Sequence, residues 1–389
     1  MPFFQDLRGT RDGQECPSYS NHPTYSWNTS PRSCMLNEPA TEKPSASLGT
    51  NRMKRSSFPP TSAASFESLV LVTLVVLCFS HSSFGAEWRR HAIDTSSRGA
   101  DGARLADANG DGWPDITTPW EEGGVVRICF HPGEKLCRQE WPSVTVGKVR
   151  SGEDAVLFDV DGDGQMDVVS SCEGKTRTMF VHWAPDEPGR SIDPAAWVTE
   201  PISAVAGKQM WMFASPMDID GRNGLDLAVS SKGSPASIGW LKSPNAARDL
   251  NKWTFHPLRP AGWVMSLVPH DMDSDGDLDM VVSDRKGAKR GVFWLENPRS
   301  NGTADQETWT EHPIGGERAE VMFLDLCDLD QDKQIDVLVP TRGGKMLLFR
   351  SDGPTARKWS QVTIPNPFDV PHGKSVRVGD IDLDGQPDI

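Results

Sequence analysis

A nine-residue acidic motif carries the most distinctive chemistry of this chain. Its clearest copy runs from Asp159 to Asp167, with carboxylates at positions 1, 3, 5 and 9 and glycine at position 6. Carboxylates this close together repel one another unless a hard cation lies among them, and Ca²⁺ prefers such oxygen ligands. Glycine at position 6 permits the positive φ that turns the chain back toward the ion. The motif therefore predicts a calcium-binding loop.

Six copies of this motif divide the chain into repeats. They begin at residues 107, 159, 218, 271, 328 and 380, so successive copies start 52 to 59 residues apart. All copies except the third offer a side-chain oxygen at every ligand position. The predicted Ca²⁺ ligands are Asp107, Asn109, Asp111, Asp115, Asp159, Asp161, Asp163, Asp167, Asp271, Asp273, Asp275, Asp279, Asp328, Asp330, Asp332, Asp336, Asp380, Asp382, Asp384 and Asp388.

Two copies depart from the pattern at positions that affect cation binding. Arg222 is position 5 of the third copy. Its guanidinium can pair with the neighbouring carboxylates in place of the ion, so we expect no Ca²⁺ there. Lys333 replaces the glycine of the fifth copy. Holding a lysine at positive φ costs about 1 kcal/mol, which predicts weaker binding. The bound ions are expected to be structural, because they rigidify the turns.

Short β-branched runs flank the motif on both sides. An EF-hand begins with the same spacing but needs a glutamate at position 12 between two helices. Position 12 is threonine, serine or valine in the first five copies, so the EF-hand interpretation fails. The motif instead predicts the turn of a β-hairpin. The fourth repeat shows four strand signals, at residues 264–270, 279–283, 291–298 and 309–314. Four antiparallel strands per repeat are typical of a propeller blade.

This combination of loop and strands resembles the FG-GAP/VCBS repeat family of β-propellers, with calcium loops like those of integrin α chains. The resemblance covers about residues 88–389. It implies an all-β fold, a β-propeller of four-stranded blades that numbers about seven blades when complete. The chain holds about five and a half blades, so we expect a C-terminally incomplete propeller. Residues 88–93 predict a lone outer strand that would complete the last blade.

Tryptophans recur at equivalent positions of the third and fourth strands of the repeats. Trp183, Trp240 and Trp294 occupy the third-strand position in successive repeats. Large aromatic side chains that recur with the repeat are expected to pack between blades rather than to bind a ligand.

The first 86 residues predict no part of the propeller. Residues 1–52 are rich in Pro, Ser, Thr and Asn, which predicts a disordered leader or an over-extended gene start. Residues 53–86 predict a signal peptide, with a basic start at Met53, an apolar run of 11 residues at 69–79 and small residues up to Ala86. We therefore expect residues 87–389 to be secreted, periplasmic or on the cell surface, with no stable membrane span after cleavage. An uncleaved N-terminal anchor is the alternative.

The composition bears on partners and on disulfides. The chain has a formal net charge of −14 at pH 7. Because binding of nucleic-acid phosphates requires a positively charged surface, no nucleic-acid partner is expected. We expect a monomer that binds an extracellular glycan or protein ligand. Cys129 and Cys137 flank a turn that a disulfide can close in a secreted protein, although their spacing leaves the pairing open.

Polar and aromatic residues gather at the start of the first strand of each repeat, which lines the channel of a propeller. The predicted ligand-binding residues are Glu153, Asp154, Lys208, Gln209, Trp211, Trp263, Arg318 and Glu320. The alternative function, by analogy of fold alone, is a carbohydrate-active enzyme such as a sugar lyase or dehydratase. The candidates for its base and cationic partner are His372, Lys374 and His270. Ordinary solvated residues around a water-filled channel are the other interpretation.

Overall fold

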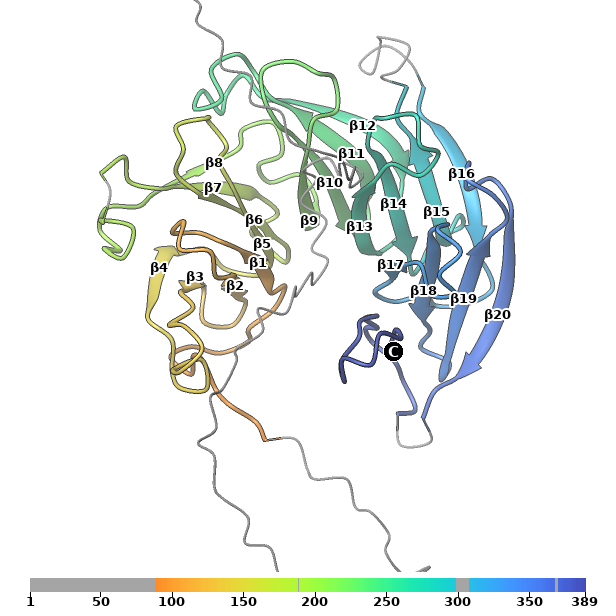
Figure 1. Cartoon of the computed structure of the whole chain (residues 1–389). Coiled ribbons are helices and arrows are strands. Elements are labelled where there is room, and N and C mark those ends of the chain that lie inside the picture. Colours follow the sequence, from red (N-terminus) through yellow and green to blue (C-terminus); the bar gives the residue numbers. More distant parts are fainter. Residues whose placement is uncertain (1–88, 188, 299–307, 368–369) are drawn as a thin grey trace, which may run out of the picture. The chain divides into compact units, whose positions relative to one another are not determined.

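Twenty β-strands make up the regular structure of the described residues. The computed structural model describes residues 89–389 apart from 188, 299–307 and 368–369. Its strands form five sheets of four antiparallel strands, each connected as a meander (Figure 1). The described residues from Ala92 onward belong to one compact unit. The predicted all-β fold of four-stranded blades is confirmed.

The strands of the five sheets have these bounds. The first sheet contains β1 (Arg104–Ala106), β2 (Asp115–Trp120), β3 (Val125–Cys129) and β4 (Ser143–Gly147), and the second contains β5 (Gly152–Phe158), β6 (Asp167–Cys172), β7 (Met179–Trp183) and β8 (Val198–Pro201). The third contains β9 (Met210–Met217), β10 (Asp226–Lys232), β11 (Ser237–Lys242) and β12 (Thr254–Pro260). The fourth contains β13 (Val264–His270), β14 (Asp279–Asp284), β15 (Gly291–Glu296) and β16 (Thr310–Gly315), and the fifth contains β17 (Asp325–Cys327), β18 (Asp336–Pro340), β19 (Lys345–Ser351) and β20 (Trp359–Pro365).

Each acidic loop of the five sheets is the hairpin turn between the first and second strands. In the fourth sheet, His270 pairs with Asp279 at the base of the turn, and Val268 pairs with Val281 further along β13 and β14. The aspartate at position 9 begins the second strand in every sheet. The predicted hairpin turn is therefore confirmed. These turns lie at one end of the strands in each sheet, and we call this end the loop edge.

Large apolar side chains fill the spaces between neighbouring sheets. One cluster joins Trp183 of β7 to Trp211 of β9 and Trp253 before β12, so it is shared by the second and third sheets. Trp240 and Trp294, from β11 and β15, are fully buried. Burying such a side chain stabilises the fold by about 2 kcal/mol or more. The predicted packing role of the repeated tryptophans is confirmed.

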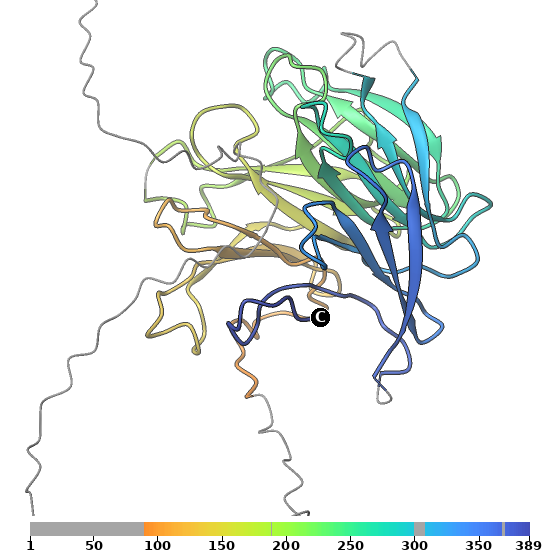
Figure 2. The same ribbon diagram turned by 45° about the vertical axis from the view of Figure 1, so that its right-hand side comes forward.

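The two ends of the described chain lie outside the five sheets. Residues 89–93 form no strand; instead, the Ile93 carbonyl accepts a hydrogen bond from the Trp141 N–H at 2.9 Å. The predicted outer strand is wrong for this segment, because Ile93 contacts the chain beside β4 without joining a ladder. Residues 370–389 are irregular chain with isolated bridges, among them Gly379 to Asp388 (Figures 1 and 2).

The predicted leader and signal peptide, residues 1–52 and 53–86, lie outside the described residues. Within the part of the chain that is described, no helix has the length and apolar character needed to cross a bilayer.

The cysteines of the first sheet are not bridged. Cys129 and Cys137 are both free thiols. The Cys129 thiol is buried 3.8 Å from an Asp94 carboxylate oxygen, and the Cys137 thiol lies 3.1 Å from the Glu134 carbonyl oxygen within its own turn. Each thiol thus has a local partner, and the disulfide considered from the sequence does not form.

Candidate metal loops and the turn-edge network

The carboxylate at position 1 organises each acidic loop. In the second loop, Asp159 Oδ1 accepts hydrogen bonds from the backbone N–H groups of Gly162 at 2.7 Å and Asp163 at 3.1 Å. Its Oδ2 accepts from the N–H of Gly164 at 2.9 Å. Gly164 has a φ of 89°, the left-handed conformation that the sequence predicted for position 6. Position 4 is also left-handed, even where it is not glycine, as at Ser274 with a φ of 63°.

The aspartate at position 9 ties the loop to the third strand of the same sheet. Asp167 is almost fully buried, and its two oxygens accept hydrogen bonds from the N–H groups of Val160 at 3.2 Å and Ala184 at 2.7 Å. Asp279 makes the same pair of contacts in the fourth sheet. Burial raises the pKa of Asp167 to about 7 and that of Asp279 to about 8. A buried carboxylate of this kind is stabilised in its ionised form by a nearby cation.

The donor atoms of the loops fit a hard divalent cation. In the second, third, fourth and fifth loops, three carboxylate oxygens lie within 4.8 Å of one another. In the fourth loop, Asp273 Oδ1 is buried and accepts no hydrogen bond from a protein group. An all-oxygen donor set with an unsatisfied buried oxygen suits Ca²⁺. The residues that would hold it there are Asp271, Asp273, Asp275 and Asp279.

The first and sixth loops have the same backbone arrangement as the second. Asp107 accepts hydrogen bonds from the N–H groups of Gly110 and Gly112, both at 2.8 Å. Asp380 accepts from the N–H of Gly385 at 2.9 Å. The sequence pattern therefore predicts the backbone geometry of these two loops as well.

The fifth loop has the expected backbone conformation at Lys333, whereas the third loop pairs with a different cation from the one expected. Lys333 has a φ of 69°, so the lysine in the fifth loop does adopt the conformation that favours glycine. In the third loop, the cation that meets the carboxylates is Lys242, whose Nζ lies 2.7 Å from Asp220 Oδ2. Arg222, which the sequence predicted for that role, has an exposed side chain. Lys242 is the last residue of β11 and lies outside the nine-residue motif, so the motif alone does not identify it as the partner.

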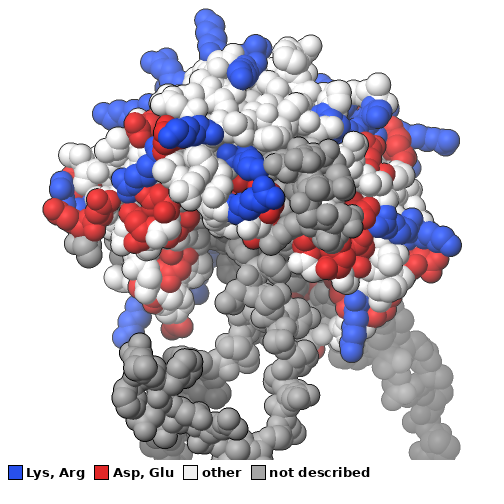
Figure 3. Space-filling view, turned by 90° about the horizontal axis from the view of Figure 1, so that it is seen from above, with Lys and Arg blue, Asp and Glu red and all other residues white. Residues whose placement is uncertain are grey.

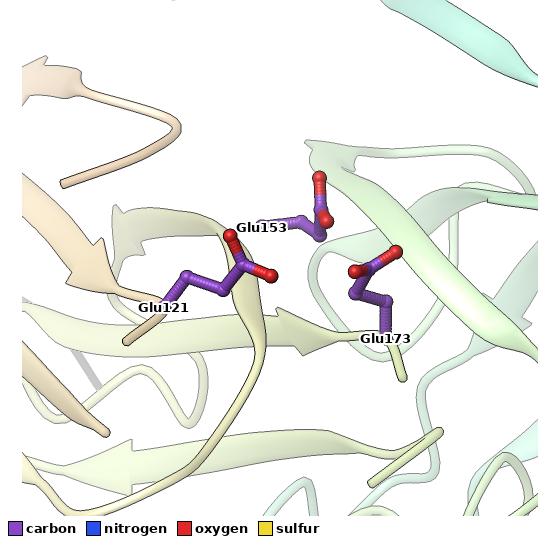
Figure 4. Close-up of side chains that lie close together, drawn as sticks. All are labelled: Glu121, Glu153 and Glu173. Carbon is purple, nitrogen blue, oxygen red and sulfur yellow. The ribbon is translucent and has the colours of Figure 1, made fainter. Parts of the chain in front are cut away.

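The opposite edge of the sheets carries a cluster of carboxylates. At this end of the strands, turns join the second strand to the third, and we call it the turn edge. Glu121 follows β2, Glu153 lies in β5 and Glu173 follows β6, and their carboxylates approach within 4.8 Å of one another (Figure 4). Lys232, at the end of β10, forms ion pairs with Glu153 at 2.9 Å and with Glu173. Burial raises the pKa of Glu153 to about 7, although the ammonium of Lys232 acts against this.

A second, cationic group continues this cluster across the fourth and fifth sheets. Lys232 Nζ lies 4.9 Å from the ring centroid of Trp263, and the guanidinium carbon of Arg285 lies 4.8 Å from the same centroid. Arg285 pairs with Glu320 at 2.9 Å, and Arg342 lies 3.7 Å from the same carboxylate. Side chains from all five sheets are thereby linked. We call this set, with the glutamate cluster, the turn-edge network.

The structure joins only part of the predicted ligand site. Glu153, Trp263 and Glu320 belong to the turn-edge network. Trp211 does not, because its side chain is fully buried in the core and its Nε1 donates to the Val205 carbonyl at 3.1 Å. The prediction that Trp211 contacts a ligand is therefore wrong.

The other predicted ligand residues have separate environments. Asp154 is buried and forms a bidentate pair with Arg104 at 2.8 and 2.9 Å. Gln209 Oε1 accepts a hydrogen bond from Ser231 Oγ at 2.5 Å. Lys208 and Arg318 are exposed. Asp154 and Gln209 therefore contact protein groups, and Lys208 and Arg318 face solvent. None of the four is part of the turn-edge network.

His270 lies apart from the other two candidate catalytic residues. His270 ends β13 at the loop edge, where it pairs with Asp279. His372 is exposed, and its Nδ1 lies 2.7 Å from the carbonyl oxygen of Arg342 beyond the other end of β18. Lys374 is also exposed. Since a strand rises about 3.3 Å per residue, the two edges lie too far apart for a shared proton transfer.

Sequence reasoning missed Glu121, Glu173, Lys232 and Arg285. Each stands at the end of a second strand or in the turn after it. The available signal was this repeated position, at which charged residues occur in several repeats. Only the packing of the sheets shows that these positions meet.

The surface charge is mixed rather than of one sign. The face seen in Figure 3 carries Asp and Glu in separate groups, with Lys and Arg between them. No continuous basic area is visible among the described residues of that face, as a surface for phosphate would need.

Residues 328–389, which include the fifth and sixth loops, match the sequence model of the FG-GAP-like repeat family. The predicted resemblance is confirmed for these residues. The comparison with curated proteins gives no match.

Among the solved structures that resemble this chain at low sequence identity are the two that follow. One is the V. cholerae biofilm matrix protein Bap1, with 14% identity and a TM-score of 0.38, covering 74% of this chain and 43% of that chain. The other is BBS1N in complex with ARL6DN, with 8% identity and a TM-score of 0.40, covering 70% of each chain. The chain thus spans less than half the length of the biofilm matrix protein.

Proposed function

We propose that this chain is an extracellular calcium-binding module that binds an acidic glycan at the turn edge of its sheets. The observation that carries the proposal is the turn-edge network, in which contacts through Lys232 and Trp263 link charged side chains from all five sheets. Extracellular placement is supported by the predicted signal peptide and by the match of residues 328–389 to an FG-GAP-like repeat. An extracellular protein ligand is the other partner class that the sequence predicts.

The calcium ions have a structural role in this proposal. The acidic loops lie at the loop edge, whereas the turn-edge network lies at the other ends of the same strands. An ion bound at the loop edge would fix the hairpin between the first two strands and leave the ligand surface free. Its binding energy would then add to the stability of the folded sheets.

The turn-edge network has a carboxylate end, the glutamate cluster, and a cationic end around Trp263. We infer that these two ends bind different groups of one acidic sugar. Carboxylates such as those of Glu121 and Glu173 can accept hydrogen bonds from sugar hydroxyls. The exposed ammonium of Lys286 lies 4.7 Å from the Trp263 ring centroid and can pair with a sugar carboxylate. Lys232 links the two ends through its contacts with Glu153 and Trp263. A glycan with both hydroxyls and carboxylates matches this charge separation.

Catalysis receives no specific support from the geometry. A lyase needs a base and an enolate-stabilising cation on the same substrate atom, or one water away. His270 lies at the other edge from His372 and Lys374, and the side chains of these two residues are exposed, so binding is the function we propose.

Affinity electrophoresis tests the proposal with hyaluronan as the acidic glycan and dextran as a neutral control. We expect hyaluronan, and not dextran, to retard the protein. Lys286→Met should weaken this affinity about tenfold, the value of one charge-assisted hydrogen bond. Lys252→Met is the matched control, because Lys252 is exposed and pairs only locally with Asp249 at 2.8 Å. Equal mobility in both gels, or an unchanged affinity of K286M, would contradict the proposal.

A further inference from the structure

Arg248 reaches from one sheet into the acidic loop of the sheet before it. Arg248 lies in the connection between β11 and β12 of the third sheet, and its Nε forms an ion pair with Asp161 of the second loop. Its Nη2 lies 3.1 Å from Asp163 Oδ2 and 3.2 Å from Asp186 Oδ1. The guanidinium carbon also lies 5.1 Å from the ring centroid of Trp183. One cation therefore touches positions 3 and 5 of the predicted calcium loop.

Arg357 repeats this arrangement two sheets later. It lies in the connection between β19 and β20 of the fifth sheet, and its Nη2 is 2.9 Å from Asp273 Oδ2 in the fourth loop. Its guanidinium carbon lies 4.9 Å from the ring centroid of Trp294. Both arginines thus come from the same connection of the following sheet, contact position 3, and lie over the third-strand tryptophan.

The contacts leave different oxygens available in the two loops. Asp161 Oδ1 accepts a hydrogen bond from the Asp163 N–H at 3.2 Å, so both of its oxygens are engaged once Arg248 binds Oδ2. In the fourth loop, Arg357 binds Oδ2 of Asp273, but Oδ1 has no hydrogen-bond partner. A cation can therefore reach position 3 of the fourth loop directly, whereas in the second loop it has to compete with Arg248.

We propose that Arg248 and Arg357 are built-in competitors of Ca²⁺, which neutralise the second and fourth loops until the ion replaces or displaces them. This inference rests on the proposed calcium binding. A guanidinium and a calcium ion attract the same carboxylates and repel each other, so each weakens binding of the other. Because each arginine belongs to the following sheet, calcium binding also loosens one contact between neighbouring sheets. Calcium affinity in these loops is coupled to sheet packing.

Calcium titration of the whole chain by calorimetry, with a competing chelator, tests the inference. Arg248→Met removes the charge and keeps an aliphatic stem over Trp183, and we expect it to raise the affinity of one site about tenfold. Arg357→Met should raise another site about threefold, because Asp273 keeps an open oxygen. Arg248→Lys, which keeps the charge, should stay close to wild type.

Arg190→Met is the matched control. Arg190 lies in the equivalent connection of the second sheet, but it pairs with Asp193 at 2.9 Å within that connection. We expect no change in its calcium affinities. Melting in chelator supplies a second readout: Arg248→Met should melt at a lower temperature without calcium and gain more from calcium than wild type. A merely structural arginine would lower both melting temperatures alike.

The outcomes separate this inference from the proposal on which it rests. If wild type binds Ca²⁺ and neither methionine variant binds it more tightly, the competitor role is wrong while calcium binding stands. If wild type binds no Ca²⁺, both proposals fall. Should R248M lose its native near-ultraviolet dichroism, R357M supplies the same comparison at an independent loop.

Discussion

Lys232 is the residue whose removal should disturb the turn edge most strongly. Its ammonium pairs with Glu153 and Glu173, and the three side chains are only 13%, 9% and 18% exposed. Removing one member of a buried charge group costs about 3 to 5 kcal/mol, since the remaining charges lose their partner. The partial exposure of this group places Lys232→Met at the lower end, about 3 kcal/mol. That corresponds to a fall of about 6 °C in the melting temperature.

The loss should depend on pH with a defined sign. Burial raises the pKa of Glu153 to about 7, above the 4.5 of an unperturbed glutamate. The folded state therefore binds more protons than the unfolded state between these values, and this contribution to stability is lost as pH rises through about 7. Without Lys232, nothing offsets the repulsion among the ionised glutamates. The destabilisation of K232M should be largest at pH 8 and should shrink toward pH 5.

Thermal melting followed by near-ultraviolet dichroism at pH 8 and pH 5 measures this prediction. Lys252→Met is the control, because Lys252 has an exposed ammonium and a similar local ion pair. Exposed ion pairs contribute little to stability, so K252M should melt near wild type at both pH values. The reasoning is refuted if K232M and K252M melt alike at pH 8. It is also refuted if K232M loses as much at pH 5 as at pH 8.

Three further predictions concern packing, backbone strain and thiols. Gly147→Ala would place a Cβ 2.1 Å from Nδ1 of the buried His182 and should cost about 2 kcal/mol, whereas Gly343→Ala has its nearest atom at 3.7 Å and should melt like wild type. Lys333→Gly relieves a φ of 69° and should raise both the melting temperature and the calcium affinity of the fifth loop, by about 1 kcal/mol in stability; a lower melting temperature would contradict the strain argument. In the native protein, a maleimide should label Cys137 and leave the buried thiols of Cys129 and Cys172 unmodified, as peptide mass spectrometry can show; a disulfide at Cys137 would contradict the free thiol.

Local features of the fold could be predicted well from the sequence. The run from Asp271 to Asp279 specifies a hairpin turn through its own spacing, and the strands on either side follow from their β-branched residues. The predicted strand at residues 264–270 coincides with β13 (Val264–His270). Such features depend on residues within one turn or one strand of each other, so the sequence displays their partners directly.

Features that depend on other strands were harder to predict. Trp211 and Trp263 stand near the starts of equivalent strands, yet one is fully buried and the other half-buried. Neighbouring residues of a strand point to opposite faces, so a shift of one position changes core into surface. Lys232 and Arg248 bind carboxylates more than 50 residues away in sequence. Those contacts follow from the packing of sheets, which repeat spacing alone does not specify.

The buried aspartate at position 9 ties each turn of the five sheets to its sheet through hydrogen bonds from the protein itself. Asp226 and Asp336 hold the third and fifth loops to their sheets through backbone N–H groups, including those of Ile219 and Leu329, both at 3.2 Å. These are the two loops whose sequences depart from the pattern, at Arg222 and Lys333. Substitutions at positions 5 and 6 of the motif therefore leave the hairpin in place. The repeats can diverge one by one in the residues of these turns while the array keeps its sheets.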